Sequence, residues 1–308
     1  MAKREVKVFA PATVSNVGPG FDLMGFAMES PGDELIIRSN DIGKIRLINE
    51  SDCALPLDPE KNVAAIAAKS LLSELEVEGG FDLIFKNKIN PGSGIGSSAA
   101  SCVAAVVGIN QILDNPLETA ALIPYALEGE KVASGALHAD NIAPALLGGI
   151  TLIRSYDPLD IKHIPYPDDL WCAVIHPDLE IKTLESRKLI PKKVSMSKAL
   201  QQCGNLAGLI AGLTTADYSL IRRSVQDVFA EPYRINQLPE FEILRSDALD
   251  AGSIGTGLSG SGPSVFSLCR GEHMAISVGE VMKTHFSGRG IGAQLYISRI
   301  SEAGCRII

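Results

Sequence analysis

Residues 90–101 read NPGSGIGSSAAS, and this stretch narrows the choice of fold more than any other part of the sequence. Its glycines stand at the alternate positions 92, 94 and 96, which lets backbone amides approach a ligand closely. A buried helix rich in alanine and valine is predicted from about Ser97 to Leu113. Free N–H groups and the positive end of the helix dipole would suit a phosphate there, although such a loop can also be a plain strand-to-helix turn.

The glycine loop (residues 90–96) and the serines after it match neither of two common nucleotide-binding patterns. No GK[ST] follows the glycines, which argues against a Walker A loop. The loop lies late in the chain and leads into Ser97-Ser98, which argues against a Rossmann dinucleotide loop. A phosphate site on this segment would therefore belong to another class of nucleotide-binding protein.

Helices and strands are mixed along the chain without strict alternation, which favours an α+β fold over a doubly wound sheet. Strands are predicted at 6–10, 35–37, 45–48, 81–89, 149–153, 171–175, 265–269 and 294–300. Helices are predicted from 62 to 71 and near 97–113, 117–134, 196–213, 217–230, 239–251 and 272–286. Prolines and aspartates gather between 157 and 169, so we expect a boundary there between a domain of residues 1–163 and one of residues 164–308.

With 308 residues, the chain has room for about two domains with buried cores. Its 28 basic and 36 acidic residues give a net charge of −8, which argues against nucleic acid or an anionic membrane as the main partner. No signal peptide and no membrane span are predicted, and the six cysteines show no CxxC spacing. We therefore expect a cytoplasmic globular protein with reduced thiols.

Two further segments accompany the glycine loop: residues 10–22 read APATVSNVGPGFD, and residues 257–264 read GLSGSGPS. Each of them alone is a plausible turn. In this order, the three segments resemble the signature of the GHMP kinases, the superfamily of galactokinase, homoserine kinase, mevalonate kinase and phosphomevalonate kinase. The resemblance implies a two-domain α+β GHMP kinase fold. Its N-terminal, ATP-binding domain would be ribosomal protein S5 domain 2-like, and its C-terminal domain would be ferredoxin-like.

Within the superfamily, two strings resemble the homoserine kinases. One is Asn16 followed by Gly18-Pro-Gly-Phe-Asp22, and the other is GALHADNIAP at residues 135–144. Mevalonate kinases instead have a lysine-containing start, and galactokinases a Gly-Arg-Val-Asn start. The glycine loop departs from the pattern at its beginning, because Asn90-Pro91 stands where homoserine kinases usually have Pro-Leu. The resemblance implies transfer of the ATP γ-phosphate to the hydroxyl of L-homoserine, a step of threonine biosynthesis.

The resemblance also implies where ATP and Mg²⁺ would bind. The nucleotide-binding segment comprises Pro91, Gly92, Ser93, Gly94, Ile95, Gly96, Ser97, Ser98, Ala99, Ala100 and Ser101. Asn62 is expected near the adenine, and a plain helix N-cap is an equally good interpretation of it. Ser98 and Glu130 are expected to hold Mg²⁺, which typically takes one or two protein oxygens. Glu128 is the rival carboxylate on spacing alone, and family position favours Glu130.

An L-homoserine molecule brings an ammonium, a carboxylate and a hydroxyl, and each predicts its own binding residues. Asp22 and Asp140 suit the ammonium. Arg187 and Arg234 suit the carboxylate, because a guanidinium can pair with it through two parallel hydrogen bonds. A solvated surface charge is the alternative for each arginine. Both arginines lie in the second half of the chain, so the site would close between the two domains.

Asn16 and Asn141 suit the substrate hydroxyl, because their side-chain amides can both donate and accept hydrogen bonds. The full predicted substrate set is Asn16, Asp22, His138, Asp140, Thr183, Arg187, Arg234 and Gly262. The predicted catalytic set is Ser98, Glu130, Asp140 and Asn141. A structural histidine is the alternative for His138. Asp140 could accept the hydroxyl proton, and direct loss of that proton to the γ-phosphate is the alternative, since phosphoryl transfer proceeds largely by positioning and electrostatics.

Two other functions stay open. One is a GHMP kinase for mevalonate, shikimate or a sugar, which would have no use for Asp22 and Asp140 as ammonium partners. The other is a non-catalytic ATP-binding protein on the same fold. Degenerate relatives usually lose the loop serines or the metal carboxylate, whereas Ser97, Ser98 and Glu130 are all present here. The resemblance also leads us to expect a homodimer.

Overall fold

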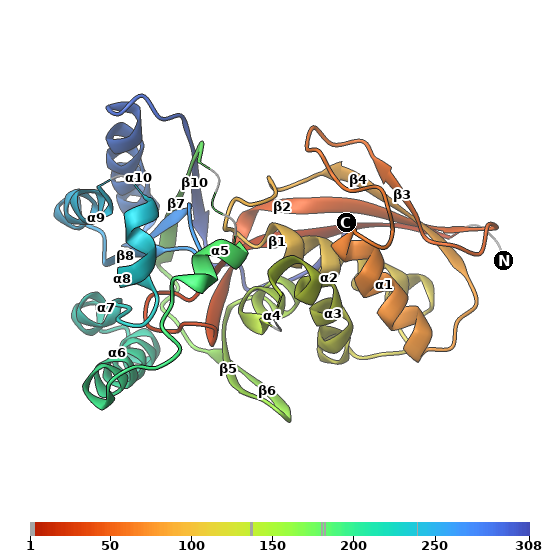
Figure 1. Ribbon diagram of the computed structural model, residues 1–308, viewed down its shortest axis with the longest axis horizontal. Coiled ribbons are helices and arrows are strands. Elements are labelled where there is room, and N and C mark those ends of the chain that lie inside the picture. The colour runs from red at the N-terminus through yellow and green to blue at the C-terminus, as the bar shows by residue number, and fades with distance from the viewer. Residues whose placement is uncertain (1–3, 136–137, 180, 182, 239) are drawn as a thin grey trace.

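The computed structural model describes residues 4–135, 138–179, 181, 183–238 and 240–308, without the side chains of 133, 134, 183 and 184. Two sheets lie side by side along the longest axis of the molecule, each with its own helices (Figure 1). The N-terminal half of the chain builds most of one layered unit, and the C-terminal half builds most of the other. The predicted α+β class is confirmed.

The first sheet has seven strands, and its longest strand organises it. The strands are β1 (Glu5–Ser15), β2 (Met24–Asn40), β3 (Arg46–Asn49), β4 (Gly80–Asn87), β5 (Ile150–Tyr156), β6 (Leu159–Ile164) and β11 (Arg306–Ile307). Their order is β11-β1-β2-β4-β3, with β5 between β2 and β6. The 17 residues of β2 pair with β5 at the beginning of the strand and with β4 at its end, and all these pairings are antiparallel. Only residues 35–37 of this strand were predicted, because its polar middle interrupts the apolar pattern.

Four helices cover one face of the first sheet (Figure 1). They are α1 (Val63–Glu74), α2 (Ser97–Ile112), α3 (Ile123–Ser134) and α4 (Ala139–Leu147), with the 3-10 helix η1 (Thr119–Leu122) before α3. Small apolar residues on all sides let α2 pack between the other helices and the sheet. A side chain at Gly108 would lie 2.3 Å from Ile37, so glycine permits the closest approach. This burial fixes the start of α2 at the end of the glycine loop.

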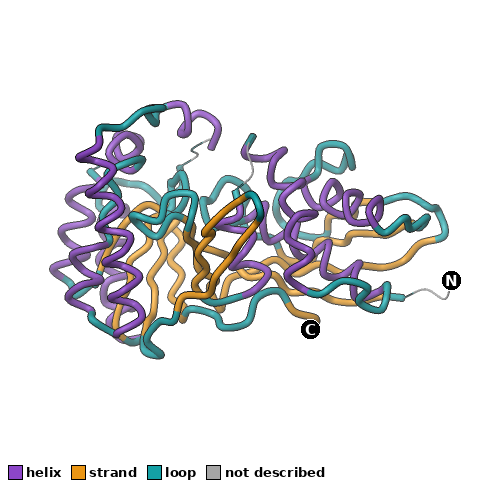
Figure 2. Tube along the Cα trace, turned by 90° about the horizontal axis from the view of Figure 1, so that it is seen from below, coloured by secondary structure: helices purple, strands orange, loops and turns teal. Residues whose placement is uncertain are grey.

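The second sheet has four antiparallel strands in the order β10-β7-β9-β8. They are β7 (Leu170–Pro177), β8 (Gly255–Leu258), β9 (Val265–Arg270) and β10 (Ala293–Arg299). The helices are α5 (Thr183–Lys188), α6 (Met196–Thr215), α7 (Tyr218–Ser224), α8 (Glu231–Arg234), the 3-10 helix η2 (Ile235–Gln237), α9 (Phe241–Asp250) and α10 (Glu272–Ser287). A second hydrophobic core packs against this sheet, and its large buried side chains include Phe241, Met282 and Phe286. Figure 2 shows its long helices and its strands as separate layers.

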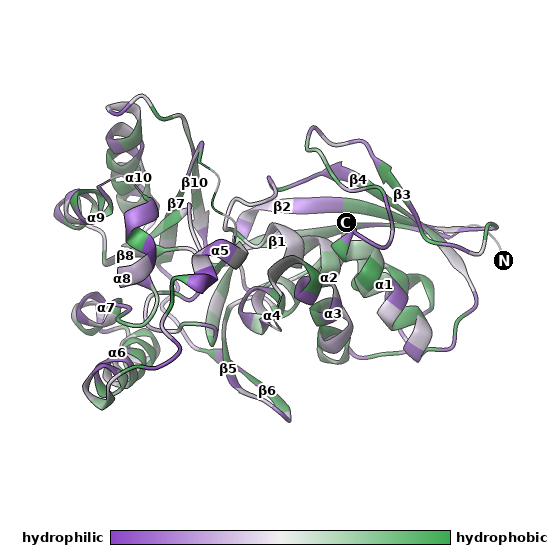
Figure 3. Cartoon of the chain, in the orientation of Figure 1, coloured by the Kyte–Doolittle hydropathy of each residue, from purple (hydrophilic) through white to green (hydrophobic). Residues whose placement is uncertain are grey.

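Hydropathy separates the core elements from the short helices that face the middle of the molecule. Hydrophobic residues concentrate on α1 and α2, whereas α5 and α8 are largely polar (Figure 3). These two short helices carry Arg187 and Arg234. None of the described helices is both long and apolar enough to cross a membrane.

Three local predictions were wrong or incomplete. Residues 157–169 are not only a linker, because β6 forms there and pairs with β5. The helix predicted near 217–230 ends at Ser224, and the Asp227 carboxylate then accepts the amides of Phe229 and Glu231, which holds a turn. Helix α4 was not among the predicted helices. The division at residue 163 stays a prediction, and β11 returns the end of the chain to the first sheet.

Candidate active site

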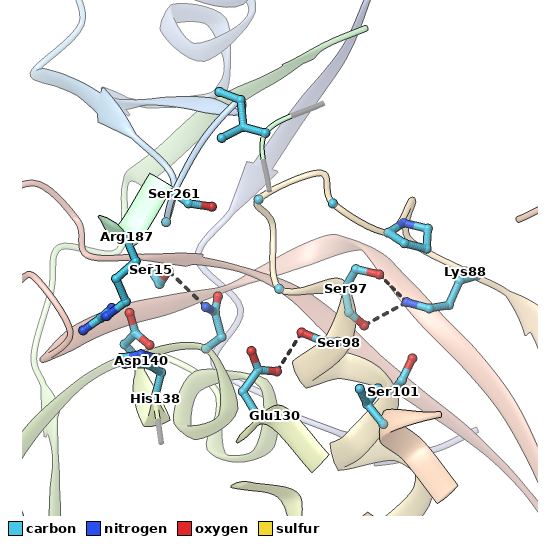
Figure 4. A pocket seen from close by; sticks show the side chains of 18 of the residues that line it. Ser15, Lys88, Ser97, Ser98, Ser101, Glu130, His138, Asp140, Arg187 and Ser261 are labelled. Carbon is cyan, nitrogen blue, oxygen red and sulfur yellow. Dashed lines mark hydrogen bonds between the residues drawn. The ribbon is translucent and has the colours of Figure 1, made fainter. Parts of the chain in front are cut away.

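A cavity of about 510 Å³ opens where the two sheets meet, and the glycine loop lines it (Figure 4). The predicted residues that line it are Asn16, Asp22, Asn62, Pro91, Gly92, Gly94, Gly96, Ser97, Ser98, Ser101, Glu130, His138, Asp140, Asn141, Arg187 and Arg234. Gly260 and Ser261 also line the cavity, so the three segments 10–22, 90–101 and 257–264 meet there. Cavities at domain interfaces are a common location of ligand sites.

The segment 257–264 holds the glycine loop in place. The Ser259 hydroxyl donates to the carbonyl of Gly94 at 2.6 Å. The Ser264 hydroxyl donates to the carbonyl of Ser93 at 2.5 Å. The shape of this loop, which lies in the first half of the chain, therefore depends on side chains from the second half.

The loop glycines are required by backbone geometry. All three have positive φ angles between 74° and 77°, a left-handed conformation that favours glycine. Gly96 also lacks room for a side chain, because a Cβ there would lie 2.0 Å from the hydroxyl of Thr13. That hydroxyl in turn donates to Asn141 Oδ1 at 2.7 Å. The loop is thus packed directly against β1 and α4.

Ser98 and Glu130 meet at the wall of the cavity. Ser98 Oγ donates a hydrogen bond to Glu130 Oε2 at 2.6 Å (Figure 4). Burial raises the pKa of Glu130 to about 7, although the Ser98 hydrogen bond and the charge of Lys88 oppose this effect. A cation beside these oxygens would favour the ionised carboxylate. Glu128, in contrast, is exposed, and its carboxylate lies 4.0 Å from the Lys131 ammonium.

Asp140 lies in the first turn of α4 and is buried at the cavity. Its Oδ1 atom has no hydrogen-bond partner among the described residues. Burial, followed by the charges of Asp22 and Glu130, raises the pKa of Asp140 to about 7. A carboxyl group with such a pKa can accept or release a proton near neutral pH.

The two asparagines join separate segments around the cavity. Asn16 Oδ1 accepts the amide of Asp22 at 3.0 Å, and Asn16 Nδ2 donates to the carbonyl of Gly260 at 2.9 Å. Asn141 Nδ2 donates to Ser15 Oγ at 3.0 Å (Figure 4). Both amides therefore have a structural role in addition to their place on the cavity wall.

Asp22 is the centre of a charged group in the same cavity. Arg187 donates to both of its carboxylate oxygens, at 2.5 and 3.2 Å. His138 Nδ1 lies 3.4 Å from Asp22 Oδ1, and burial lowers the pKa of this histidine. Arg234 is buried and donates to the carbonyl of Gly260 at 2.9 Å. The interpretation as a solvated surface charge is therefore wrong for Arg234, whereas Arg187 is partly buried and paired with Asp22.

Comparison with known proteins identifies the family. The family model for the GHMP kinase N-terminal domain matches residues 62–149, and the family model for the C-terminal domain matches residues 198–288. The homoserine kinase of Chlorobium phaeobacteroides (strain BS1) is 41% identical over 99% of this chain and 100% of its own length. The chain belongs to the GHMP kinases. The family predicted from the three sequence segments is confirmed.

Solved structures of GHMP kinases share the whole fold. The crystal structure of homoserine kinase from Cytophaga hutchinsonii has a TM-score of 0.95 at 45% identity, over 100% of this chain and 98% of the other. Mevalonate kinase from L. major in complex with R-mevalonate has a TM-score of 0.76 at 16% identity, over 98% of both chains, which is a likeness of fold alone. Family membership makes this protein an ATP-dependent kinase. Because kinases of two different acceptors share this fold, the fold alone does not indicate an acceptor.

Some predicted residues of this GHMP kinase do not line the cavity. They are Ser93, Ile95, Ala99, Ala100 and Gly262. The side chains of Ile95, Ala99 and Ala100 point into the hydrophobic core, while Gly262 lies against Gly94 and so supports the loop. Their predicted contacts with ligand stay predictions. The side chain of Thr183 lies outside the described part of the chain.

Asn62 has the structural role that its sequence context predicts. Its Oδ1 atom accepts the amides of Ala64 and Ala65 at 3.0 and 3.3 Å, which caps helix α1. Asn62 also lines the cavity. The N-cap interpretation is confirmed, and the contact with adenine stays a prediction.

Lys88 lines the cavity and was missed in the sequence. Its Nζ atom lies 3.0 Å from the buried carboxylate of Asp33 and donates to the carbonyl of Ser97 at 2.8 Å and to the Ser97 hydroxyl (Figure 4). Asp33 also accepts the hydroxyl of Ser101 at 2.7 Å. The only signal in the sequence was the position of this lysine two residues before the glycine loop. The buried ammonium of Lys88 thus contacts Ser97 at the predicted phosphate site.

Proposed function

We propose that this GHMP kinase transfers the γ-phosphate of ATP to the hydroxyl of L-homoserine, giving ADP and O-phospho-L-homoserine. The observation that carries the proposal is one cavity with the glycine loop on one wall and Asp22, Arg187 and Arg234 on another. A hydroxylated amino acid brings charges that match these side chains, while the loop suits phosphates. The similarity to the homoserine kinases of Chlorobium phaeobacteroides and Cytophaga hutchinsonii supports the same activity.

The nucleotide would lie along the glycine loop, with its phosphates at the start of α2 and its adenine near Asn62. Free backbone amides, the helix dipole and the ammonium of Lys88 all favour negative charge there. Mg²⁺ would be held by Ser98 and Glu130, and phosphate oxygens and water would complete its ligands. No group of three or more His, Cys, Asp or Glu side chains that could hold a metal ion occurs in the described part of the chain. When bound, the metal would neutralise charge on the transferred phosphoryl group.

The substrate would lie between the charged group and the glycine loop. Its carboxylate would pair with Arg187 and Arg234, and its ammonium with Asp22 and Asp140. The remaining predicted substrate contacts are Asn16, His138, Asn141, Thr183 and Gly262. Asparagine amides near the hydroxyl would orient it towards the γ-phosphate, and such positioning supplies most of the catalysis in phosphoryl transfer.

Asp140 is the candidate acceptor for the hydroxyl proton. Its pKa is about 7, and its Oδ1 atom has no hydrogen-bond partner in the part of the chain that the structure describes, which suits that role. The reaction would transfer the proton from the substrate oxygen to Asp140 as the new oxygen–phosphorus bond forms and the bond to ADP breaks. Direct transfer of the proton to the γ-phosphate remains the alternative.

A substrate panel tests the proposal. ADP release with Mg-ATP should be far faster with L-homoserine than with mevalonate, shikimate or galactose. Equal or better turnover of one of these three would assign the protein to another branch of the GHMP kinases. Tight ATP binding without turnover of any acceptor would favour the non-catalytic alternative.

The cellular setting is a further part of the proposal. We expect a cytoplasmic enzyme with no nucleic acid or membrane partner, which is in line with the net charge of −8. A homodimer is expected from the family resemblance. Light scattering after size-exclusion chromatography measures the mass directly, and a mass of one chain at micromolar concentration would contradict the dimer.

A further inference from the structure

Phe21 lies in the turn between β1 and β2, directly before Asp22. The guanidinium carbon of Arg187 is 5.5 Å from the centre of its ring, and that of Arg234 is 5.6 Å away. The two arginines come from different helices, α5 and α8, and both line the cavity. One aromatic ring is therefore the shared neighbour of both cations.

Two neighbouring guanidinium groups repel each other and need fixed partners. Arg187 has the carboxylate of Asp22. Arg234 donates to the carbonyl of Gly260, and its Nε atom has no hydrogen-bond partner among the described residues. The face of an aromatic ring attracts a cation and also orients the flat guanidinium group. The ring is thus an orienting contact for Arg234 that leaves its hydrogen-bond donors available.

Simple core packing does not account for Phe21. Its side chain is partly exposed, and it belongs to neither of the two hydrophobic cores in the described part of the chain. The contacts that the structure gives this ring are those with the guanidinium groups of Arg187 and Arg234.

We propose that Phe21 is a positioning residue that holds Arg187 and Arg234 in the arrangement that accepts a carboxylate, and so selects amino-acid acceptors. This inference rests on the proposed function, in which the two arginines bind the carboxylate of homoserine. Phe21 acts through the arginines, so its removal affects carboxylate-bearing acceptors and spares the nucleotide.

The test compares Phe21→Leu with Phe21→Tyr in two-substrate kinetics. Leucine keeps an apolar side chain but loses the ring, and we expect KM for L-homoserine to rise about tenfold or more. Because ATP binds elsewhere, KM for ATP should stay within twofold. Tyrosine restores the ring and should bring KM for L-homoserine back towards the wild-type value. The acceptor 3-aminopropan-1-ol, which is homoserine without its carboxylate, should be used equally poorly by all three proteins.

A matched control is available at Phe9. Its ring lies 4.4 Å from the guanidinium carbon of Arg306, away from the cavity, so Phe9→Leu also removes a contact between a ring and a cation. This variant should keep the wild-type KM for L-homoserine. An unchanged KM in Phe21→Leu, or an equal loss with both acceptors, would overturn the inference, because either result means that the ring does not act on carboxylate binding.

A second measurement separates this inference from the proposed function. Labelling of arginines by phenylglyoxal, followed by mass spectrometry, reports the environment of each guanidinium without any turnover. If the wild type does not phosphorylate homoserine, the proposed function fails, and the labelling alone then decides the role of Phe21. Faster labelling of Arg234 in Phe21→Leu, with the wild-type rate in Phe21→Tyr, supports the positioning role, and equal rates in all three proteins overturn it.

Discussion

Arg187 donates hydrogen bonds to both carboxylate oxygens of Asp22, although 165 residues separate the two in the chain. Under the proposed function, these side chains bind opposite ends of the substrate, which carries both a carboxylate and an ammonium. In the free protein they bind each other. A zwitterionic acceptor would therefore replace one internal ion pair by two new ones, whereas an acceptor with one charge would leave either Arg187 or Asp22 without a partner. Such a loss discriminates against mevalonate, which carries a carboxylate but no ammonium.

The variant Arg187→Ala should lower kcat/KM for L-homoserine by about 30-fold or more. Removing one partner of a buried, hydrogen-bonded charge pair costs ~2–5 kcal/mol, and each ~1.4 kcal/mol is tenfold. Arg187→Lys should recover little of the loss, because lysine lacks the two-pronged geometry. Steady-state kinetics with both substrates measure the effect, and KM for ATP should change little. The exposed Arg223 provides the control, and equal kinetics for Arg187→Ala and Arg223→Ala would end the carboxylate assignment.

The variant Glu130→Gln should lower kcat at least ~100-fold, equivalent to about 2.7 kcal/mol of transition-state stabilisation. Glutamine keeps the shape of the side chain but removes the charge that would bind Mg²⁺. The exposed Glu128, two residues before Glu130 on the same helix, is the matched control, and Glu128→Gln should have a mild effect. Titration of activity with Mg²⁺ measures both variants. The reverse ranking would move the metal site to Glu128.

Two glycine variants separate backbone strain from direct collision. Gly92 and Gly96 have similar positive φ angles, so alanine at either position costs roughly 1–2 kcal/mol in backbone conformation. A Cβ at Gly92 would meet none of the described residues within 4 Å, whereas one at Gly96 would lie 2.0 Å from the Thr13 hydroxyl. Gly96→Ala should therefore weaken ATP binding much more than Gly92→Ala does. Calorimetric titration with ATP gives both affinities, and equal losses would mean that the close approach to Thr13 is unimportant.

Lys88 should contribute far more to stability than its neighbour Lys86. Lys88 and Asp33 are both almost fully buried, with side-chain exposures of 3% and 0%, so Lys88→Met leaves a buried carboxylate without its cation. Such a loss typically costs ~3–5 kcal/mol. Lys86 pairs with Glu50 at the surface, and Lys86→Met should cost less than ~1 kcal/mol. Urea unfolding measures both, and a free energy of unfolding for Lys88→Met within ~1 kcal/mol of wild type would contradict the prediction.

The buried carboxyl of Asp140 should make the free protein less stable as the pH rises. Its pKa is about 7 in the folded state and ordinary in the unfolded state, so the folded protein binds more protons between pH 4 and 7. The free energy of unfolding therefore falls across this range. Asp140→Asn removes the titration and should be more stable than wild type at pH 8 by at least ~1 kcal/mol, although less active.

Chemical unfolding at several pH values, without nucleotide and with a chelator, checks this expectation. Asp250→Asn is the control, because Asp250 is exposed on α9 and should follow the wild-type curve. If Asp140→Asn were less stable than wild type at pH 8, the ionised carboxylate would be a favourable part of the free fold.

Much of the local structure follows from neighbours in the sequence. Asn62 caps α1 because an asparagine side chain reaches the amides two and three residues ahead, so its pattern is visible within a short window. Glycines 92, 94 and 96 and the small residues of α2 likewise predict a tight loop and a buried helix. The three motifs together also point to the family. Helix α4, in contrast, was missed, since Pro144 lies inside it and is usually a breaker of helices.

The sequence by itself therefore determined the family, the mixed fold class and the residue types of the nucleotide loop, because these depend on short-range patterns. The tertiary structure alone decided which distant residues meet. Lys88 donates a hydrogen bond to the carbonyl of Ser97, and Ser259 donates one to the carbonyl of Gly94. The ring of Phe21 contacts two arginines from separate helices. Pairings of this kind come from how the two sheets pack against each other, and no local pattern of hydropathy or turn residues encodes them.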